Sequence, residues 1–391
     1  MPARAYFHPS NLMSTPSSTR ARYIMIGGFL GAGKTTAVAK LAQRLSERGL
    51  KVGLITNDQG RELVDTKMLR SKGFATEEIP GGCFCCRFNS LVEAADRLTT
   101  ATQPDVFIAE PVGSCTDLVA TVTYPLRRIY GDSFLIAPVS VLVDPIRAAR
   151  VLGLETGGSF SEKVIYIYRK QLEEADIIVI NKLDLLSPER ADQLRAALAA
   201  QFPRAEILTL SAREGTDLDA WFSKLETGEQ VEAPAMQMDY DIYADGEALL
   251  GWLNATVQFS ATTPFDAERA ISTLARDIQD RLRAQHAEIA HLKMTYSPDE
   301  ALAGEIAAVN LVRNDFVPEL SLKLPEPSSR GQLIINLRAE QSPEVLAETV
   351  RAALTELPAQ VPTLTAQLDH LEHFRPGRPT PTHRDAAPAL S

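Results

Sequence analysis

The chain has 391 residues, of which 45% are hydrophobic and 23% charged, and its formal net charge is −10. This length and composition suit about two globular domains with sizeable cores. The negative charge argues against general binding to nucleic acid or to an anionic membrane. No apolar run approaches the ~20 residues that a membrane span needs.

The cysteines and the first residues bear on the cellular location. The chain has four cysteines, three of them clustered, which is unlike a disulfide scaffold and suits a reducing, cytoplasmic compartment. Residues 1–20 contain no acidic residue and no apolar stretch typical of a secretory signal, so we expect a disordered tail. An organellar transit peptide is the less favoured alternative, and translation from Met13 would remove most of the segment.

From residue 21 to residue 228, nearly continuous apolar segments alternate with segments of helical periodicity. The predicted strands are 21–28, 51–58, 74–80, 105–111, 139–145, 175–181 and 205–211, and the clearest helices are 34–49, 89–100 and 187–202. Strands that are apolar throughout are typical of a parallel sheet covered by helices on both faces. The sequence therefore predicts an α/β domain with a mostly parallel sheet.

A short Pro-containing linker, 229–238, separates this domain from a different pattern over 239–358. There the alternating segments are 255–261, 289–296, 306–312 and 332–338, and the amphipathic helices are 265–285 and 342–357. This pattern predicts a smaller α+β domain with an antiparallel sheet. Residues 359–391 are rich in Pro and Arg and are predicted to be an extended or disordered tail.

The segment "GFLGAGKT" (28–35) fits the phosphate-loop pattern G-x-x-x-x-G-K-[ST] between a predicted strand and a predicted helix. Its glycines let backbone N–H groups surround phosphate oxygens, and the helix N-terminus adds positive potential. Lys34 should reach the β- and γ-phosphates, and the Thr35 hydroxyl should bind Mg²⁺. The residues predicted to contact the nucleotide are Gly28, Gly31, Ala32, Gly33, Lys34, Thr35 and Thr36.

The segment "VINKLD" (179–184) ends a strand in the pattern N-K-x-D. Asp184 would accept two hydrogen bonds from guanine N1–H and its exocyclic amine, whereas adenine would leave the carboxylate unpaired. Asn181 would bind the guanine edge or brace the loop, and Lys182 would pack its stem along the base.

The segment "LSARE" (210–214) follows the next predicted strand, where backbone N–H groups reach toward a guanine carbonyl. The residues that would supply them are Ser211 and Ala212. Because both segments follow the phosphate loop at strand ends, the predicted nucleotide is GTP.

A further strand, in "DVFIAEPVGS" (105–114), ends in a carboxylate. Glu110 occupies the usual place of the acid that holds Mg²⁺ through water, and Gly113 would donate its N–H to the γ-phosphate. A purely structural Glu110 is the alternative. Asp58 and Glu110 are the candidates for positioning the attacking water, with Gln59 a weaker one.

Four motifs together resemble the CobW-type family of P-loop GTPases, relatives of the hydrogenase and urease accessory GTPases. They are "GGFLGAGKTT" (27–36), "GGCFCC" (81–86), "EPVG" (110–113) and "NKLD" (181–184). The resemblance covers the N-terminal domain and implies slow GTP hydrolysis and delivery of zinc or another transition metal to client enzymes. The C-terminal domain matches the family's β-rich alternation only loosely.

The chain departs from the family pattern in two regions. The usual N-E-F-G-E run is "NDQGRE" (57–62), with Asp58 in place of one acid and Arg61 where a second is common. This weakens the case for a carboxylate in the metal site. A histidine-rich loop is missing; His370 and His373 are spaced to share a helix face with a metal, although exposed histidines are the favoured interpretation.

The segment "GGCFCC" holds three of the four cysteines within four positions, and core packing, a redox pair and a metal site are the alternatives. Two glycines before the cysteines let the backbone curl so that the sulfurs converge on zinc, with cobalt or iron also open. The predicted ligands are Cys83, Cys85 and Cys86. Asp58, water or a client would supply the fourth ligand, and Cys115 is expected to serve mainly in packing.

The favoured function is a GTP-dependent metallochaperone that uses GTP, Mg²⁺ and zinc and serves an unidentified metal-dependent client protein. A metal-responsive sensor with a weak GTPase is the second hypothesis. A P-loop small-molecule kinase is the third, and the guanine-reading motif argues against it. A homodimer stays open.

Overall fold

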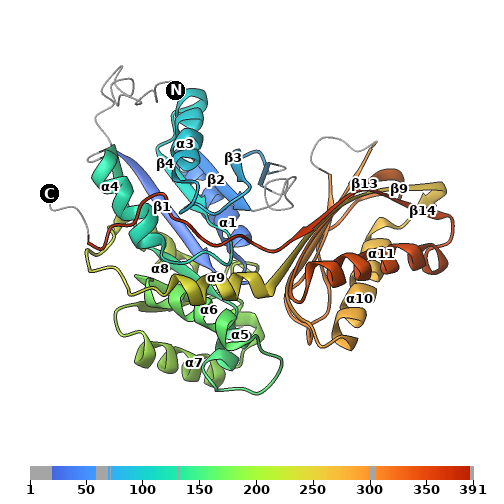
Figure 1. Ribbon diagram of the computed structural model, residues 1–391. Coiled ribbons are helices and arrows are strands. Elements are labelled where there is room, and N and C mark those ends of the chain that lie inside the picture. Colours follow the sequence, from blue (N-terminus) through green and yellow to red (C-terminus); the bar gives the residue numbers. More distant parts are fainter. Residues whose placement is uncertain (1–19, 59–68, 71, 131–132, 300–304, 388–391) are drawn as a thin grey trace, which may run out of the picture.

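The computed structural model describes residues 20–58, 69–70, 72–130, 133–299 and 305–387. Two domains lie side by side, each built on its own sheet (Figure 1). No helix in these ranges is long and apolar enough to cross a membrane.

The N-terminal domain is built on an eight-stranded parallel sheet, which confirms the predicted α/β fold. Its strand order is β3-β2-β4-β1-β6-β7-β8, and β5 pairs with β1. The strands are β1 (Ala21–Gly28), β2 (Val52–Asp58), β3 (Ala75–Pro80), β4 (Val106–Glu110), β5 (Phe134–Ile136), β6 (Ser140–Val143), β7 (Ile177–Ile180) and β8 (Glu206–Thr209). The helices are α1 (Lys34–Glu47), α3 (Phe88–Thr102), α4 (Tyr124–Tyr130), α5 (Pro145–Val151), α6 (Glu162–Glu173), α7 (Pro188–Gln201) and α8 (Leu218–Thr227).

Both faces of this sheet are buried, which explains why its strands are apolar throughout. In β1, Tyr23 and Met25 belong to a core with α3 and α6, whereas Ile24 and Ile26 belong to a core with α1 and α8. Successive side chains of a strand point to opposite faces, so each strand has to supply apolar residues to both cores. The carboxyl ends of the parallel strands meet at one edge, where every predicted motif lies.

The C-terminal domain is a six-stranded antiparallel sheet with helices on one face, which confirms the predicted α+β domain (Figure 1). The strand order is β12-β11-β10-β13-β9-β14. The strands are β9 (Leu250–Phe265), β10 (Glu288–Pro298), β11 (Ala307–Leu311), β12 (Glu319–Leu322), β13 (Ser328–Glu340) and β14 (Leu364–Phe374). The helices are α9 (Tyr240–Leu249), which leads into β9, and α10 (Ala267–Ala284) and α11 (Pro343–Gln360), which cover the sheet.

The region predicted as a tail from residue 359 contains strand β14, so that part of the prediction is wrong. Strand β14 is an edge strand paired with β9, from Leu364 opposite Ala261 to Phe374 opposite Trp252. Most of its side chains are exposed or half-buried, so the sequence lacks the apolar alternation that marks the other strands. After β14, the chain runs back across the N-terminal domain (Figure 1).

The predicted pairing of His370 and His373 on a helix face is also wrong. Both lie on β14, opposite Thr256 and Leu253 of β9, and both are exposed. Residues three apart on a strand point to opposite faces. The favoured interpretation, that both histidines are exposed, is confirmed.

Candidate functional site

The phosphate loop joins β1 to α1 in a conformation that its glycines permit. Gly33 has φ of +90°, and a Cβ there would lie 2.4 Å from Asn181 Nδ2. Gly31 has φ of +80°, and a Cβ there would lie 2.9 Å from Val312 Cβ in the C-terminal domain. Glycine is needed at both positions because the backbone is left-handed and its neighbours are close.

Lys34, Thr35 and Glu110 come together below this loop, and all three are buried. Lys34 Nζ donates to the Gly28 carbonyl at 2.9 Å, which holds the ammonium across the loop. The Thr35 hydroxyl donates to Glu110 Oε1 at 2.9 Å. A hydroxyl and a carboxylate in contact beside a phosphate loop suit Mg²⁺, which takes oxygen ligands and keeps several waters.

Asn181 braces the loops of the site, one of its two predicted roles. Its Nδ2 donates to the Ala32 carbonyl at 2.9 Å, and its Oδ1 accepts from the backbone N–H groups of Lys182 at 2.8 Å and Ala212 at 3.0 Å. The Ala212 N–H, predicted to reach guanine, is therefore hydrogen-bonded to Asn181. Asp184 is exposed and accepts a hydrogen bond from the Ser211 hydroxyl at 2.5 Å.

The Lys182 side chain bridges the phosphate loop and a buried acid that the sequence analysis did not single out. Its Nζ lies 2.8 Å from both the Gly31 carbonyl and Asp144 Oδ2. Arg313 of the C-terminal domain reaches the other oxygen of Asp144 at 2.8 Å. Burial alone would raise the pKa of Asp144, but Lys182 and Arg313 outweigh it and hold the pKa below its ordinary value. Like Glu110, Asp144 follows an apolar strand, and this signal was available in the sequence.

Arg147, which is fully buried, fastens the phosphate loop to the C-terminal domain. Its guanidinium donates to the carbonyls of Leu30 and Val312, both at 2.5 Å, and to Ile289 at 3.2 Å. A buried cation that donates to several carbonyls rigidifies what it joins. The two domains therefore share one wall of the site.

A cavity of about 430 Å³ lies above the phosphate loop, between the two domains. Its N-terminal wall includes the predicted residues Gly31, Gly33, Lys34, Thr35, Thr36, Glu110, Gly113, Lys182 and Asp184. Its C-terminal wall includes His291, Lys293, Asn310 and Ser321, which the sequence analysis did not assign to the site. Burial lowers the pKa of His291, and Lys293, Arg338 and Lys34 lower it further, so the imidazole is neutral at pH 7.

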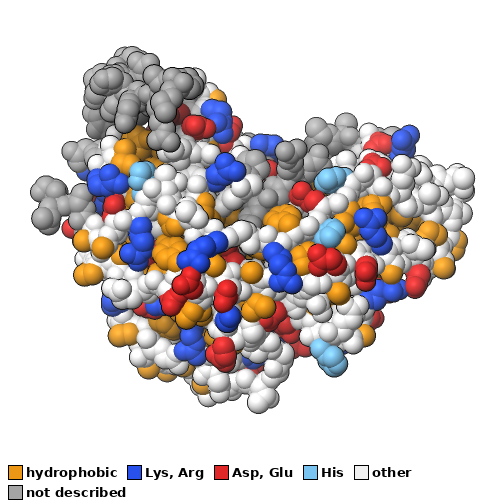
Figure 2. All heavy atoms as spheres, in the orientation of Figure 1, with side chains coloured by type: hydrophobic (Ala, Val, Ile, Leu, Met, Phe, Trp, Pro, Cys, Tyr) orange, Lys and Arg blue, Asp and Glu red, His pale blue; other side chains and the backbone are white. Residues whose placement is uncertain are grey.

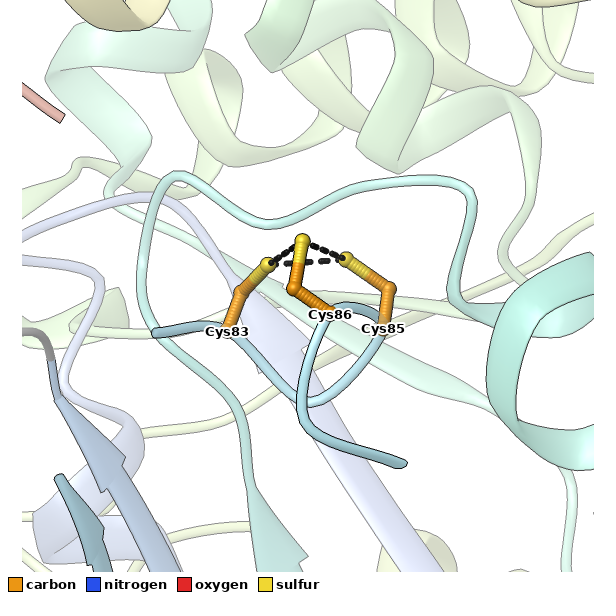
Figure 3. Close-up of side chains that lie close together, drawn as sticks. All are labelled: Cys83, Cys85 and Cys86. Carbon is orange, nitrogen blue, oxygen red and sulfur yellow. Dashed lines mark hydrogen bonds between the residues drawn. The ribbon is translucent and has the colours of Figure 1, made fainter. Parts of the chain in front are cut away.

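The three cysteines follow β3 and point toward one another (Figure 3). Their Sγ atoms are 2.8 Å apart for Cys83 and Cys85, 3.2 Å for Cys83 and Cys86, and 3.7 Å for Cys85 and Cys86. Tetrahedral zinc with Zn–S near 2.3 Å needs sulfurs about 3.8 Å apart. An opening of about 1 Å at the closest pair would therefore suit zinc, which supports the predicted ligand set.

Cys115 was expected to serve mainly in packing, but it also forms a hydrogen bond with Cys83 of this cluster. Hydrogen bonds from Cys115, Cys85 and Cys86 lower the pKa of Cys83 well below its ordinary value. Hydrogen bonding to Cys83 raises the pKa of Cys86 to about 11. These opposite directions make Cys83 the cysteine of the three that ionises most readily, and a metal would displace the remaining thiol protons.

Asn57 connects the cavity with the cysteine loop. It lies at the end of β2, lines the cavity and is buried. Its Nδ2 donates to the carbonyls of Ile79 at 2.8 Å and Gly82 at 2.6 Å, directly before Cys83. One side chain therefore contacts both candidate sites.

Residues 22–209 match the family model for the CobW/HypB/UreG nucleotide-binding domain. The match covers most of the N-terminal domain. The zinc chaperone YeiR of Escherichia coli K12 is 34% identical over 175 residues, 44% of this chain and 49% of that protein. The zinc chaperone CobW of a Sinorhizobium species is 30% identical over 218 residues, 50% of this chain and 58% of that protein. The chain spans about half the length of the curated relatives it matches.

Among solved structures, Zn(II)-bound YjiA GTPase from Escherichia coli is 16% identical, with a TM-score of 0.35. The match covers 87% of this chain and 99% of that chain.

The predicted roles of Gly113, Asp58 and Gln59 stay predictions. Gly113 lines the cavity, and its carbonyl accepts from Gln171 Nε2 at 2.9 Å; donation of its N–H to a γ-phosphate stays a prediction. The Asp58 side chain and residues 59–68, which include Gln59 and Arg61, lie outside the described part of the chain.

Proposed function

We propose that this chain is a GTP-binding and GTP-hydrolysing metallochaperone that binds zinc, or another transition metal, at Cys83, Cys85 and Cys86 and passes it to a client protein. The observation that carries the proposal is Asn57, which lines the nucleotide cavity and hydrogen-bonds the backbone before Cys83. The match of residues 22–209 to the model of a nucleotide-binding domain supports a nucleotide in this cavity. The names of the relatives YeiR and CobW, both zinc chaperones, support zinc as the cargo.

In the nucleotide site, this chain would act mainly by positioning and charge. Lys34 would leave the Gly28 carbonyl for the β- and γ-phosphates. Thr35 and Glu110 would hold Mg²⁺, which supplies charge neutralisation at the phosphate oxygens. Gly113 would donate its N–H to the γ-phosphate, so the loop after β4 would sense the state of the nucleotide. Little else is required, because phosphoryl transfer depends on positioning and electrostatics.

Base selection should depend on Asp184, which lines the cavity. We expect GTP to bind much more tightly than ATP, because ATP would leave the carboxylate without its two donors. Asp184→Asn should shift the preference toward xanthosine triphosphate, whose ring carbonyl replaces the guanine amine. Ser211→Ala, which removes only the hydroxyl that contacts Asp184, is the matched control and should keep the GTP preference. Equal GTP and ATP affinities in the parent protein would contradict this assignment.

The metal site suits a carrier because three protein ligands leave one coordination position for a ligand of the client. Cys83 and Cys85 are buried, whereas Cys86 is partly exposed. The exposed side is where a client would approach. A cytoplasmic location fits this chemistry, since a reducing compartment keeps the four cysteines as thiols.

Turnover in the presence and absence of zinc separates this proposal from its alternatives. For a chaperone, we expect hydrolysis of GTP to GDP and phosphate at a rate that changes severalfold when zinc occupies the cysteines. Zinc binding with no measurable turnover would instead favour a metal-responsive sensor. Transfer of phosphate to a small molecule would favour a kinase and would contradict the proposal.

A further inference from the structure

The last described residues, 375–387, cross the N-terminal domain and lie on the cysteine loop (Figure 1). The Thr382 backbone N–H donates to the Cys85 carbonyl at 2.9 Å, and the Thr382 hydroxyl donates to the Cys86 carbonyl at 3.2 Å. The Thr380 backbone N–H donates to Cys86 Sγ at 3.2 Å. The segment therefore contacts a candidate metal ligand itself as well as the backbone beside it.

The far end of the segment is anchored by a buried acid. Arg384 Nε lies 2.7 Å from Asp117 Oδ2, and a terminal nitrogen of Arg384 lies 3.3 Å from Asp117 Oδ1. Asp117 is almost completely buried and also accepts from the Tyr240 hydroxyl at 2.6 Å. A paired guanidinium and carboxylate is a strong and directional contact. Asp117 lies seven residues after Glu110, on the loop that would sense the nucleotide.

Beside Arg384, Asp385 donates its backbone N–H to the Ala120 carbonyl at 2.8 Å and pairs with Arg128 at 2.8 Å. The other contacts of the segment are weaker. The His383 ring meets the edge of Phe88, with ring centroids 5.0 Å apart. Arg378 pairs with Asp241, whose side chain is 80% exposed, and pairs of this kind contribute little. Figure 2 shows basic and acidic side chains interspersed on the face that the segment crosses. Such a segment can detach without unfolding either core.

We propose that residues 375–387 form a strap that belongs to the metal site, covers Cys86 and has to detach before the metal is handed over. This inference rests on the proposed metal binding at the cysteines. The Thr380 N–H stabilises the Cys86 thiolate once a metal has displaced the thiol proton, since hydrogen bonds to charged sulfur favour the charged form. The Arg384–Asp117 pair couples the strap to the loop after Glu110, so the nucleotide state controls its release.

The strap is built for repeated closure. Its prolines, Pro376, Pro379 and Pro381, restrict the chain to extended conformations, which lowers the entropic cost of laying it back on the surface. Its contacts with Cys85 and Cys86 are made by Thr380 and Thr382, two short side chains that lose little freedom when the strap closes. After the strap has detached, a ligand of the client would approach the side of Cys86 that the strap had covered.

Two pairs of variants of the full chain test the strap. Thr380→Pro removes the N–H that donates to Cys86, and Thr380→Ala is its control because it keeps the N–H. Arg384→Ala removes the anchor, and Arg378→Ala is its control because its ion pair is exposed. The first readout is the rate at which zinc-loaded protein loses zinc to an excess chromophoric chelator, with GDP or a non-hydrolysable GTP analogue. The second is the rate at which iodoacetamide alkylates Cys86 in metal-free protein.

Thr380→Pro and Arg384→Ala should each speed zinc loss about tenfold, the size expected for one lost hydrogen bond to a charged group. Cys86 alkylation in the metal-free protein should also be faster than in the parent, because the strap then covers the Cys86 thiol less of the time. The controls should match the parent, and Arg384→Ala should also lose the dependence of zinc loss on the nucleotide. Parent-like rates in both test variants, or equal rates in Thr380→Pro and Thr380→Ala, would overturn the proposal. The alkylation measurement needs no metal. It therefore tests whether the strap covers Cys86 even if the cysteines prove not to bind zinc.

Discussion

Replacing Cys83, Cys85 and Cys86 together by serine should weaken zinc binding at least about a thousandfold, or about 4 kcal/mol. The three Sγ atoms lie within 4.8 Å of one another, and thiolates are the ligands that bind zinc most strongly here. A serine hydroxyl keeps the approximate size of each side chain but does not ionise near pH 7. The measurement is a competition titration with a chelator of known zinc affinity.

Cys115→Ser is the matched control for this variant. Cys115 hydrogen-bonds to Cys83 from the loop after β4 but lies outside the cluster of three. We expect its replacement to change zinc affinity less than about tenfold, since it removes one hydrogen bond to a thiolate. Zinc binding as tight in the triple variant as in the parent would show that the assigned site is wrong.

Lys34→Ala should reduce GTP hydrolysis at least about a hundredfold, below practical detection for a slow GTPase. The ammonium of Lys34 lies across the phosphate loop, and it is the charge best placed to stabilise the β–γ bridge during transfer. Thr35→Ala should instead weaken the dependence on Mg²⁺. Phosphate release from protein purified in parallel, under single-turnover conditions, measures both effects.

Lys51→Ala provides the control for Lys34→Ala, because Lys51 is an exposed lysine directly before β2 that does not line the cavity. It should hydrolyse GTP at the parent rate. Hydrolysis in Lys34→Ala at the parent rate would mean that the measured activity belongs to a contaminating enzyme.

The fold of the N-terminal domain and most of its site were predictable from the sequence, because the signals are local. Lys34, Glu110 and Asn181 each lie at or just after the end of an apolar strand within a short motif, and parallel strands bring their carboxyl ends to one edge. Asp144 carries the same signal as Glu110. Its importance becomes visible only when Lys182 and Arg313 reach it from other elements.

The contributions of the C-terminal half depend on contacts that no short segment encodes. In the sequence, His291 and Lys293 look like ordinary residues of an alternating strand. They become part of the cavity wall only because the two domains pack together. The edge strand β14 is too polar to show the alternation of apolar and polar residues that is typical of a strand, so the sequence predicts a tail in this region. The strap that follows has no periodicity at all, and its contacts with Cys86 span almost three hundred residues.

The two sites are linked by a short chain of contacts at one sheet edge. Asn57 of β2 pairs with Ile79 of β3, and the preceding Thr56 pairs with Glu110 of β4. A shift of the loop after Glu110 on hydrolysis would therefore be felt at Asn57 and at the backbone before Cys83. Coupling of this kind typically changes affinity five- to 150-fold, or about 1–3 kcal/mol.

The most direct test of this account is the zinc affinity of the full chain with a non-hydrolysable GTP analogue and with GDP, measured by competition against a chelator. We predict that the two dissociation constants differ at least about fivefold in the parent. In Asn57→Ala the difference should shrink, while zinc and nucleotide each still bind. Equal zinc affinities in the two nucleotide states of the parent would contradict nucleotide-controlled metal delivery.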